Sequence, residues 1–183
     1  MKIAGTFVVA IWAAFLLNFI IPFDFNNIGL TPRSIVGLLG IVTMPFLHGS
    51  LGHIISNTIP IFILISLLGA TCKRPVLEIV TELIFVGGCL LWAFGNQGTH
   101  IGASGLVYAL VTYLVMAGIW SKNSQRAAVG FFVAIFYSGL VWGVLPTQPG
   151  VSWAGHLFGA IGGVVVAYGQ FMSGQIEKKH EKT

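Results

Sequence analysis

A serine and a histidine lie in two short, glycine-containing runs of an otherwise apolar sequence. Ser104 stands in the run GASG, and His156 stands in the run SWAGH. A hydroxyl and an imidazole that meet in space can act as the nucleophile and the general base of a serine hydrolase. No acidic third member is evident, because Asp24 belongs to the first outer loop and Glu78 and Glu82 lie near the cytoplasmic end of the predicted span at 76–94. We therefore expect a Ser–His dyad.

A second polar group, formed by His53 and Asn57, could supply hydrogen-bond donors. Their i, i+4 spacing places both side chains on one face of a helix, where both can donate hydrogen bonds to one point. A set of donors is a further part of a serine hydrolase. The spacing alone fits hydrogen bonds between packed helices equally well. His48 precedes this helix, and we expect it to support a loop.

Glycines next to these residues allow helices to approach closely. Gly102 and Gly105 flank Ser104 and permit a tight turn at a helix start, where unpaired N–H groups point outward. Gly159 and Gly163 follow His156 at i+3 and i+7, a small-residue stripe that packs against a neighbouring helix. If that neighbour carries Ser104, His156 can reach it. Taken by itself, Ser104 could also be an ordinary small packing residue.

The elements that must position these residues are membrane helices. Of the 183 residues, 56% are apolar and 8% are charged, whereas roughly a quarter are charged in a soluble domain. The mean hydropathy is +0.91. We expect an all-α membrane protein with a single domain over 1–183, built as a six-transmembrane-helix bundle. The apolar runs predict spans at about 3–23, 52–70, 76–94, 102–120, 127–145 and 153–172.

The basic residues predict the orientation of this bundle. Eight of the nine fall on one side of the predicted spans, and only Arg33 falls on the other. The eight are Lys2, Lys73, Arg74, Lys122, Arg126, Lys178, Lys179 and Lys182. By the positive-inside rule, both termini are cytoplasmic. The sequence pI of 9.3 is therefore a topology signal, and we expect no nucleic-acid partner.

The predicted topology places the polar residues at one depth. The spans at 52–70, 102–120 and 153–172 all run inward from the outer face. His53, Asn57, Ser104 and His156 fall within the first two turns of these spans, hence within about 10 Å of one another in depth. Four unrelated packing residues would not be expected to align in this way, so the shared depth favours one site.

Other polar residues have simpler explanations. Glu78 and Glu82 are expected to form a membrane-edge ion pair with Arg74 and a hydrogen bond facing the bundle. Cys72 and Cys89 are too far apart for a disulfide. We expect no metal and no cofactor, because no cysteine or carboxylate joins the histidines at their depth. The stretch at 35–46 is too short to span and predicts an interfacial or re-entrant element.

These motifs resemble those of the rhomboid intramembrane serine proteases. The run HGSLGHIISN at 48–57 resembles the family's His-x4-His-x3-Asn signature, and GASG resembles its Gly-x-Ser-Gly, with Tyr108 four residues after the serine. The run GHLFG at 155–159 with Gly163 resembles the pattern of the final helix. The resemblance covers nearly the whole chain. Two features depart from it: Pro32-Arg33 replaces a Trp-Arg pair, and a glutamate late in the span at 52–70 is missing.

The resemblance implies a role for each residue. Ser104 would be the nucleophile, His156 the general base and then acid, and Tyr108 would pack against the imidazole. His53, Asn57 and the Ser104 N–H would form the oxyanion hole. The substrates would be transmembrane proteins, cleaved near the outer leaflet after entry beside the span at 127–145 and the loop at 146–151.

The expected protein is thus a serine endopeptidase in a lipid membrane, the plasma (inner) membrane of a bacterium. A rhomboid-like protein that binds membrane helices without cleaving them is the main alternative. A small transporter or channel is a third reading, for which charged residues near the midplane or an internal repeat would be typical. The sequence shows neither feature.

Overall fold

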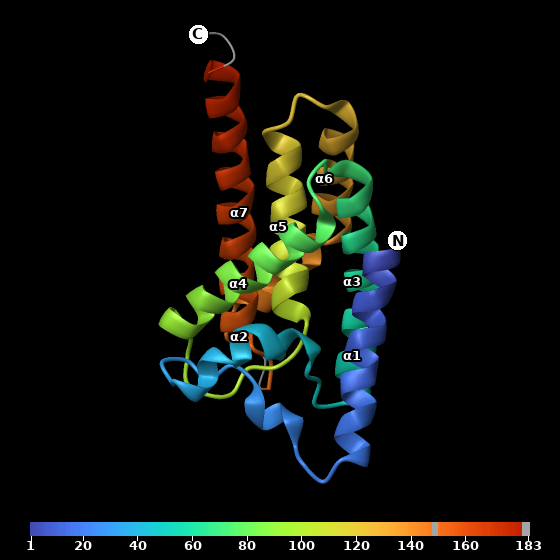
Figure 1. The fold of residues 1–183 in the computed structure, drawn as a ribbon, viewed down its shortest axis with the longest axis vertical. Coiled ribbons are helices and arrows are strands. Elements are labelled where there is room, and N and C mark those ends of the chain that lie inside the picture. The colour runs from blue at the N-terminus through green and yellow to red at the C-terminus, as the bar shows by residue number, and fades with distance from the viewer. Residues whose placement is uncertain (148–149, 181–183) are drawn as a thin grey trace.

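The computed structural model describes residues 1–147 and 150–180, with the side chains of 175–180 excepted. Within this part of the chain, six longer helices form the bundle (Figure 1). They are α1 (Lys2–Ile20), α3 (Leu51–Thr71), α4 (Val76–Phe94), α5 (Ser104–Ile119), α6 (Ser124–Phe136) and α7 (Trp153–His180). The expectation of an all-helical protein is confirmed.

The lengths of these helices bear on how many cross a membrane. Four of the described helices, α1, α3, α4 and α7, are long and apolar enough to do so. A fifth span results if α6 is combined with η4 (Ser138–Val144), to which it is joined at a bend of 59°. The remaining helix, α5, has 16 residues and is about 24 Å long, shorter than a hydrocarbon core of about 30 Å. The count of six spans stays a prediction.

Two helix boundaries differ from the expected spans for local reasons. The stretch at 127–145 is not one helix, because the chain leaves α-helical geometry at Tyr137, where φ is −106° and ψ is 11°. The Ser138 hydroxyl donates to the Ile135 carbonyl at 2.9 Å, in competition with the main-chain ladder. The expected helix at 102–120 begins at Ser104 instead, because Gly102 has a φ of +110° and cannot continue a helix backward.

The helix that carries Ser104 lies at the centre of the bundle. It packs against α7, α6, α3 and α4, and its closest partner is α7. Gly159 of α7 lies against the Gly105 carbonyl, and Gly163 lies against the Ala109 carbonyl, so closely that neither position has room for a Cβ atom. The prediction that the glycine stripe after His156 packs against a neighbouring helix is confirmed, and that neighbour is the helix that carries Ser104.

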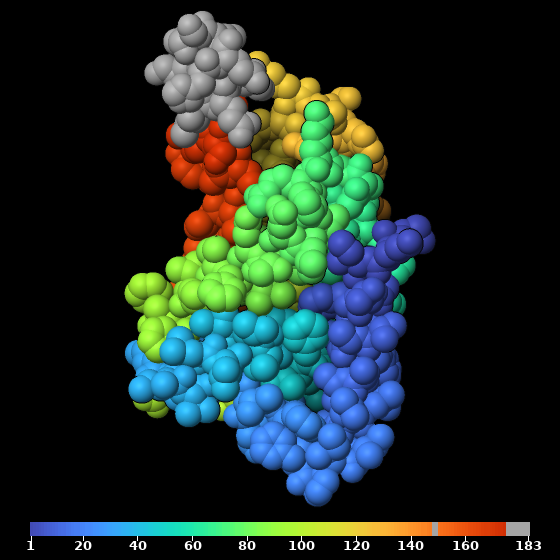
Figure 2. Space-filling model, in the orientation of Figure 1, coloured from blue at the N-terminus to red at the C-terminus, as the bar shows by residue number. Residues whose placement is uncertain are grey.

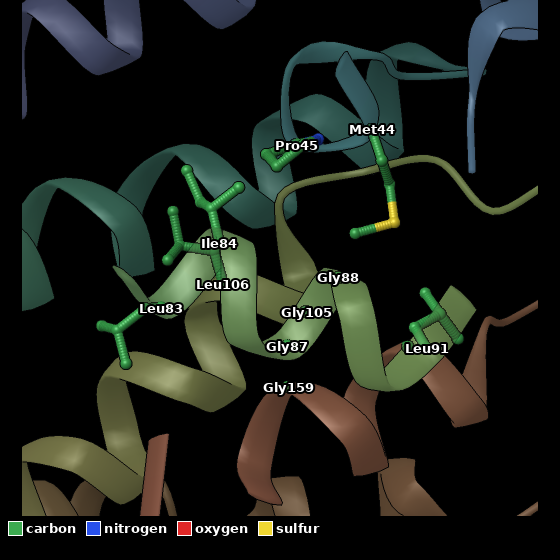
Figure 3. Close-up of a pocket in the computed structure, with 11 residues that line it drawn as sticks. Met44, Pro45, Leu83, Ile84, Gly87, Gly88, Leu91, Gly105, Leu106 and Gly159 are labelled. Carbon is green, nitrogen blue, oxygen red and sulfur yellow. The ribbon is translucent and has the colours of Figure 1, made fainter. Parts of the chain in front are cut away.

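Glycines also bring α4 into this contact. Figure 3 shows Gly87 and Gly88 of α4 beside Gly105 and Gly159, under the side chain of Met44. The cavity that these helices enclose has a volume of only about 10 Å³ and a mainly apolar lining. A buried water needs about that volume and two to four polar partners. The contact is therefore a packing seam that fixes the spacing of the three helices.

The segment between α1 and α3 is folded into short helices. These are η1 (Phe25–Ile28), η2 (Val36–Leu38), α2 (Gly40–Thr43) and η3 (Met44–Phe46). The segment packs against α4, as the space-filling view shows (Figure 2). Ile35, Val36 and Leu39 are 86%, 67% and 64% exposed. Short helices with exposed apolar side chains fit the interfacial element that the sequence predicts.

Charged residues gather where α3 ends and α4 and α6 begin. The Arg74 guanidinium contacts Glu82 at 2.5 Å and Glu78 at 3.3 Å. The prediction for Glu82 was therefore wrong in one respect: its carboxylate joins the edge ion pair, because a long arginine side chain reaches both turns of α4. Arg126 Nε donates to the Thr71 carbonyl at 2.7 Å, at the end of α3. A cation is favourable at a helix C-terminus.

Several expectations concern the two ends of the bundle. In Figure 1 the end of α7 lies toward one end of the long axis and the segment between α1 and α3 lies toward the other, while the start of α1 lies about halfway between them. Lys182 lies outside the described residues, as do the side chains of Lys178 and Lys179. Which end faces the cytoplasm stays a prediction from the basic residues. Cys72 and Cys89 are both free cysteines.

Candidate active site

The serine of the GASG run is the first residue of α5. Gly102 provides the turn before it, with a φ of +110° and with the His53 ring so close that a Cβ atom would overlap it. The Gly102 N–H donates to the Met44 carbonyl at 2.9 Å, which ties this turn to η3. The first main-chain bond of α5 joins the Val107 N–H to the Ala103 carbonyl. Earlier N–H groups, including that of Ser104, have no partner within the helix.

The histidine of the second run lies in the first turn of α7 and contacts Ser104. Its Nε2 atom is 2.8 Å from Ser104 Oγ, and its Nδ1 atom is 2.8 Å from the Gly143 carbonyl in η4. A carbonyl can only accept, so Nδ1 carries the proton and Nε2 of the neutral ring is a bare acceptor. The Ser104 hydroxyl therefore donates to His156. This is the arrangement in which an imidazole can remove the serine proton.

The ring of His156 is held on its face as well as at its edges. Tyr108 stacks on it with a centroid distance of 4.2 Å and an interplanar angle of 9°. The Tyr108 hydroxyl donates to the Leu140 carbonyl at 2.8 Å. Both the imidazole and the phenol thus bond to carbonyls of η4. The 3-10 segment after the bend supplies the orienting acceptor that a carboxylate supplies in a Ser-His-Asp triad.

His53 and Asn57 lie beside the turn that precedes Ser104. Asn57 is only 4% exposed, and its Nδ2 atom donates to the His53 carbonyl at 2.7 Å. An amide nitrogen carries two protons, so one donor of Asn57 remains for another acceptor. The His53 ring lies against Gly102. Both side chains line the same cavity as Ser104.

His48 lies behind this group and contacts the nucleophile loop. Its Nε2 atom accepts from the Ala103 N–H at 3.4 Å, and its Nδ1 atom is 3.4 Å from the Phe46 carbonyl. The ring is 2% exposed and lies edge-on to His53 at a centroid distance of 4.9 Å. Burial and the neighbouring His53 lower the pKa of His48 to about 4. A neutral His48 accepts from the residue just before Ser104, which fits a supporting role.

An open cavity of about 930 Å³ gives access to these residues. Its lining comes from the first turns of α3, the loop before α5, the region from Tyr137 to Gly143 and the residues just before α7. It includes Ser104, His156 and Tyr108, together with polar groups from the loop at 96–101. The cavity is large enough for a short stretch of extended polypeptide, and its polar groups can hold water next to the serine.

Sequence reasoning missed one buried polar residue beside this cavity. His100 is 5% exposed, and its Nδ1 atom lies 2.6 Å from Ser152 Oγ. The rule that identified His53 and His156 selects an ionisable residue near the outer end of an apolar helix. His100 precedes both the expected span at 102–120 and the observed start of α5 at Ser104, so the rule does not select it. No group of three or more metal-ligating side chains occurs among the residues that the structure describes.

The sequence of this chain matches one protein-family model and several relatives. The family model described as "Rhomboid domain" matches residues 37–173. Uncharacterized protein Rv1337 of Mycobacterium tuberculosis and uncharacterized protein Mb1372 of Mycobacterium bovis are each 31% identical over 172 residues, which cover 89% of this chain and 72% of theirs. Uncharacterized protein ML1171 of Mycobacterium leprae is also 31% identical over 172 residues, or 68% of its length.

Proposed function

The chain belongs to the rhomboid family, and on that premise we propose that it is an intramembrane serine protease. It hydrolyses peptide bonds of transmembrane protein substrates near the outer leaflet. The observation that carries the proposal is the 2.8 Å contact between Ser104 Oγ and the Nε2 atom of a His156 ring whose Nδ1 proton is bound by a carbonyl.

The chemistry follows from this geometry. His156 takes the Ser104 proton as the serine oxygen attacks the substrate carbonyl, and it then gives that proton to the departing amine. The acyl-enzyme is hydrolysed when His156 activates a water from the cavity. The Nδ1–H···O=C bond to Gly143 keeps the ring in the required tautomer through both steps.

The negative charge of the tetrahedral intermediate needs donors on the cavity side of Ser104. We assign these to the Ser104 N–H, the remaining Asn57 amide proton and the His53 ring. Such donors are each worth up to about 10²- to 10³-fold in turnover when they are already in place. Asn57→Ala and His53→Ala should therefore weaken cleavage less than loss of Ser104 or His156.

The membrane setting belongs to the same proposal. The chain is an integral membrane protein with several apolar helices. We propose that six helices span a bacterial plasma membrane with both termini in the cytoplasm, so that the cavity opens toward the outer leaflet. Lipid surrounds the exposed apolar side chains, and a substrate helix enters beside α6 and the residues before α7.

A fluorophosphonate, which reacts with activated serines, tests the proposal in purified protein. The wild type should be labelled and should cleave a reconstituted single-span substrate carrying small residues near its outer end. Ser104→Ala should do neither. Ser173→Ala is the matched control, since Ser173 is exposed in α7 and its hydroxyl, within the described part of the chain, bonds only to the Gly169 carbonyl. A folded wild type that is neither labelled nor active would refute the protease, and a rhomboid-like protein that binds helices without cleaving them would take its place.

A further inference from the structure

A second serine and histidine pair lies next to Ser104 and His156. The Nδ1 atom of His100 is 2.6 Å from Ser152 Oγ, and its Nε2 atom is 3.0 Å from the Asn96 carbonyl. The His100 ring is buried, although no charged partner faces it among these contacts. The reaction proposed above uses neither residue, so the pair needs its own explanation.

The direction of each hydrogen bond in this pair follows from its chemistry. The Asn96 carbonyl can only accept, so His100 Nε2 carries the proton and Nδ1 is the acceptor. The Ser152 hydroxyl therefore donates to His100. Ser152 Oγ in turn accepts from the Gly155 N–H at 3.2 Å. Burial lowers the pKa of His100, which favours this neutral ring.

Both members of the pair are anchored to the main chain. His100 exchanges two hydrogen bonds with Leu30, its N–H donating at 2.8 Å and its carbonyl accepting at 3.0 Å. Ser152 precedes the first residue of α7, where its side chain caps the Gly155 N–H. The Ser152 carbonyl accepts from the His156 N–H at 3.1 Å. Ser152 thus sets the start of the helical turn that carries His156.

The positions of the pair in the chain match those of the reacting residues. His100 lies four residues before Ser104, and Ser152 lies four residues before His156. The hydrogen bond between His100 and Ser152 therefore joins the segment just before α5 to the segment just before α7. We infer that His100 and Ser152 are positioning residues that hold the first turn of α7 against the loop before α5, so that His156 Nε2 stays within reach of Ser104 Oγ. This inference rests on the proposed protease function.

The bonds of Ser152 argue against a second nucleophile. Its oxygen already accepts a main-chain proton from Gly155 while its own proton is held by His100. An oxygen that caps a helix start is less free to attack a carbonyl than Ser104 Oγ is. Among the described residues, the Ser104 side chain forms a hydrogen bond to His156 and no other. The fluorophosphonate should therefore be found on Ser104 and not on Ser152.

The experiment separates the rate of labelling from its final extent. A role confined to stability would lower the labelled fraction and leave the rate of the folded fraction unchanged. Positioning predicts the reverse: Ser152→Ala is labelled to the wild-type extent but about tenfold more slowly, since a displacement of 1 Å can cost roughly 10²-fold. The kcat for the reconstituted substrate should fall by a similar factor, with KM within about twofold.

Conservative variants and a control complete the design. Ser152→Thr keeps a hydroxyl at the helix start, and His100→Asn keeps an acceptor facing Ser152, so both should be labelled at close to the wild-type rate. His100→Leu removes the same hydrogen bond from the other side and should behave like Ser152→Ala, so either variant decides the matter if the other does not fold. Ser173→Ala, on the same helix, should match the wild type.

The outcomes distinguish this inference from the function on which it rests. An unreactive wild type refutes the protease. A reactive wild type together with Ser152→Ala or His100→Leu labelled at the wild-type rate refutes positioning alone. A label found on Ser152 by peptide mass analysis would also overturn it, because Ser152 would then be a nucleophile.

Discussion

Replacement of Gly159 by alanine tests how far the Ser104 and His156 contact depends on helix spacing. A Cβ atom at Gly159 would overlap the Gly105 carbonyl, and it would also lie within 3.1 Å of Gly105 Cα. Ordinary contacts of a Cβ atom begin near 3.4 Å. The overlapped atoms are main-chain atoms of a packed helix and cannot turn aside. We therefore expect α7 to move away from α5 by about 1 Å, the shift that would bring the overlapping Cβ atom back to an ordinary contact distance.

That shift has a calculable effect, because Gly105 adjoins Ser104 and Gly159 lies one turn after His156. The distance from Nε2 to Oγ would rise from 2.8 Å toward about 4 Å, beyond hydrogen-bond range. A misplacement of this size costs roughly 10²-fold in rate. Overpacking should also lower the free energy of unfolding by about 1–3 kcal/mol.

The assay compares the labelling rate, the cleavage rate and the melting temperature of Gly159→Ala with those of Gly169→Ala. Gly169 lies on the same helix, and a Cβ atom there meets nothing within 4 Å. The control should keep wild-type activity and gain about 0.5–1 kcal/mol of stability from the better helix propensity of alanine. If Gly159→Ala kept both the activity and the melting temperature of the wild type, the reasoning from helix spacing would be refuted.

Four further predictions concern other parts of the chain. Ser104→Ala and His156→Ala should each abolish detectable cleavage, and the double variant should lose nothing more, because the two residues act as a unit; additive losses would contradict a dyad. Glu82→Gln should change the melting temperature slightly and the specific activity not at all, because its ion pair with Arg74 is partly exposed and worth at most about 1 kcal/mol. The pKa of buried His48 is about 4 in the fold and about 6.5 in an unfolded chain. The unfolded state therefore binds the proton more tightly, and stability should fall as the pH drops from about 6.5 toward 4. This loss, followed as melting temperature against pH, should be smaller in His48→Asn. A reporter fused after Thr183 should be active only in its cytoplasm-sensing form, on the eight-to-one distribution of basic residues; activity on the outer side would invert the proposed topology.

The amino-acid sequence by itself determined the helical class and most of the residues around the cavity. Apolar stretches of spanning length leave the main chain few ways other than a helix to pair its polar groups in lipid. The spacing of His53 and Asn57 places them on one helix face, and the glycines after His156 mark the face of α7 that packs closely. These properties depend on residue type and helical periodicity, which are local.

Only the tertiary structure decided which partners these residues meet. The acceptor for His156 Nδ1 is the Gly143 carbonyl, and it lies within reach because the chain bends by 59° after α6. A main-chain carbonyl has no sequence signature, so no residue type could announce it. The bond between His100 and Ser152 joins loops 52 residues apart. Such a contact depends on how α5 and α7 cross, and the crossing is set by glycines on both helices rather than by either loop.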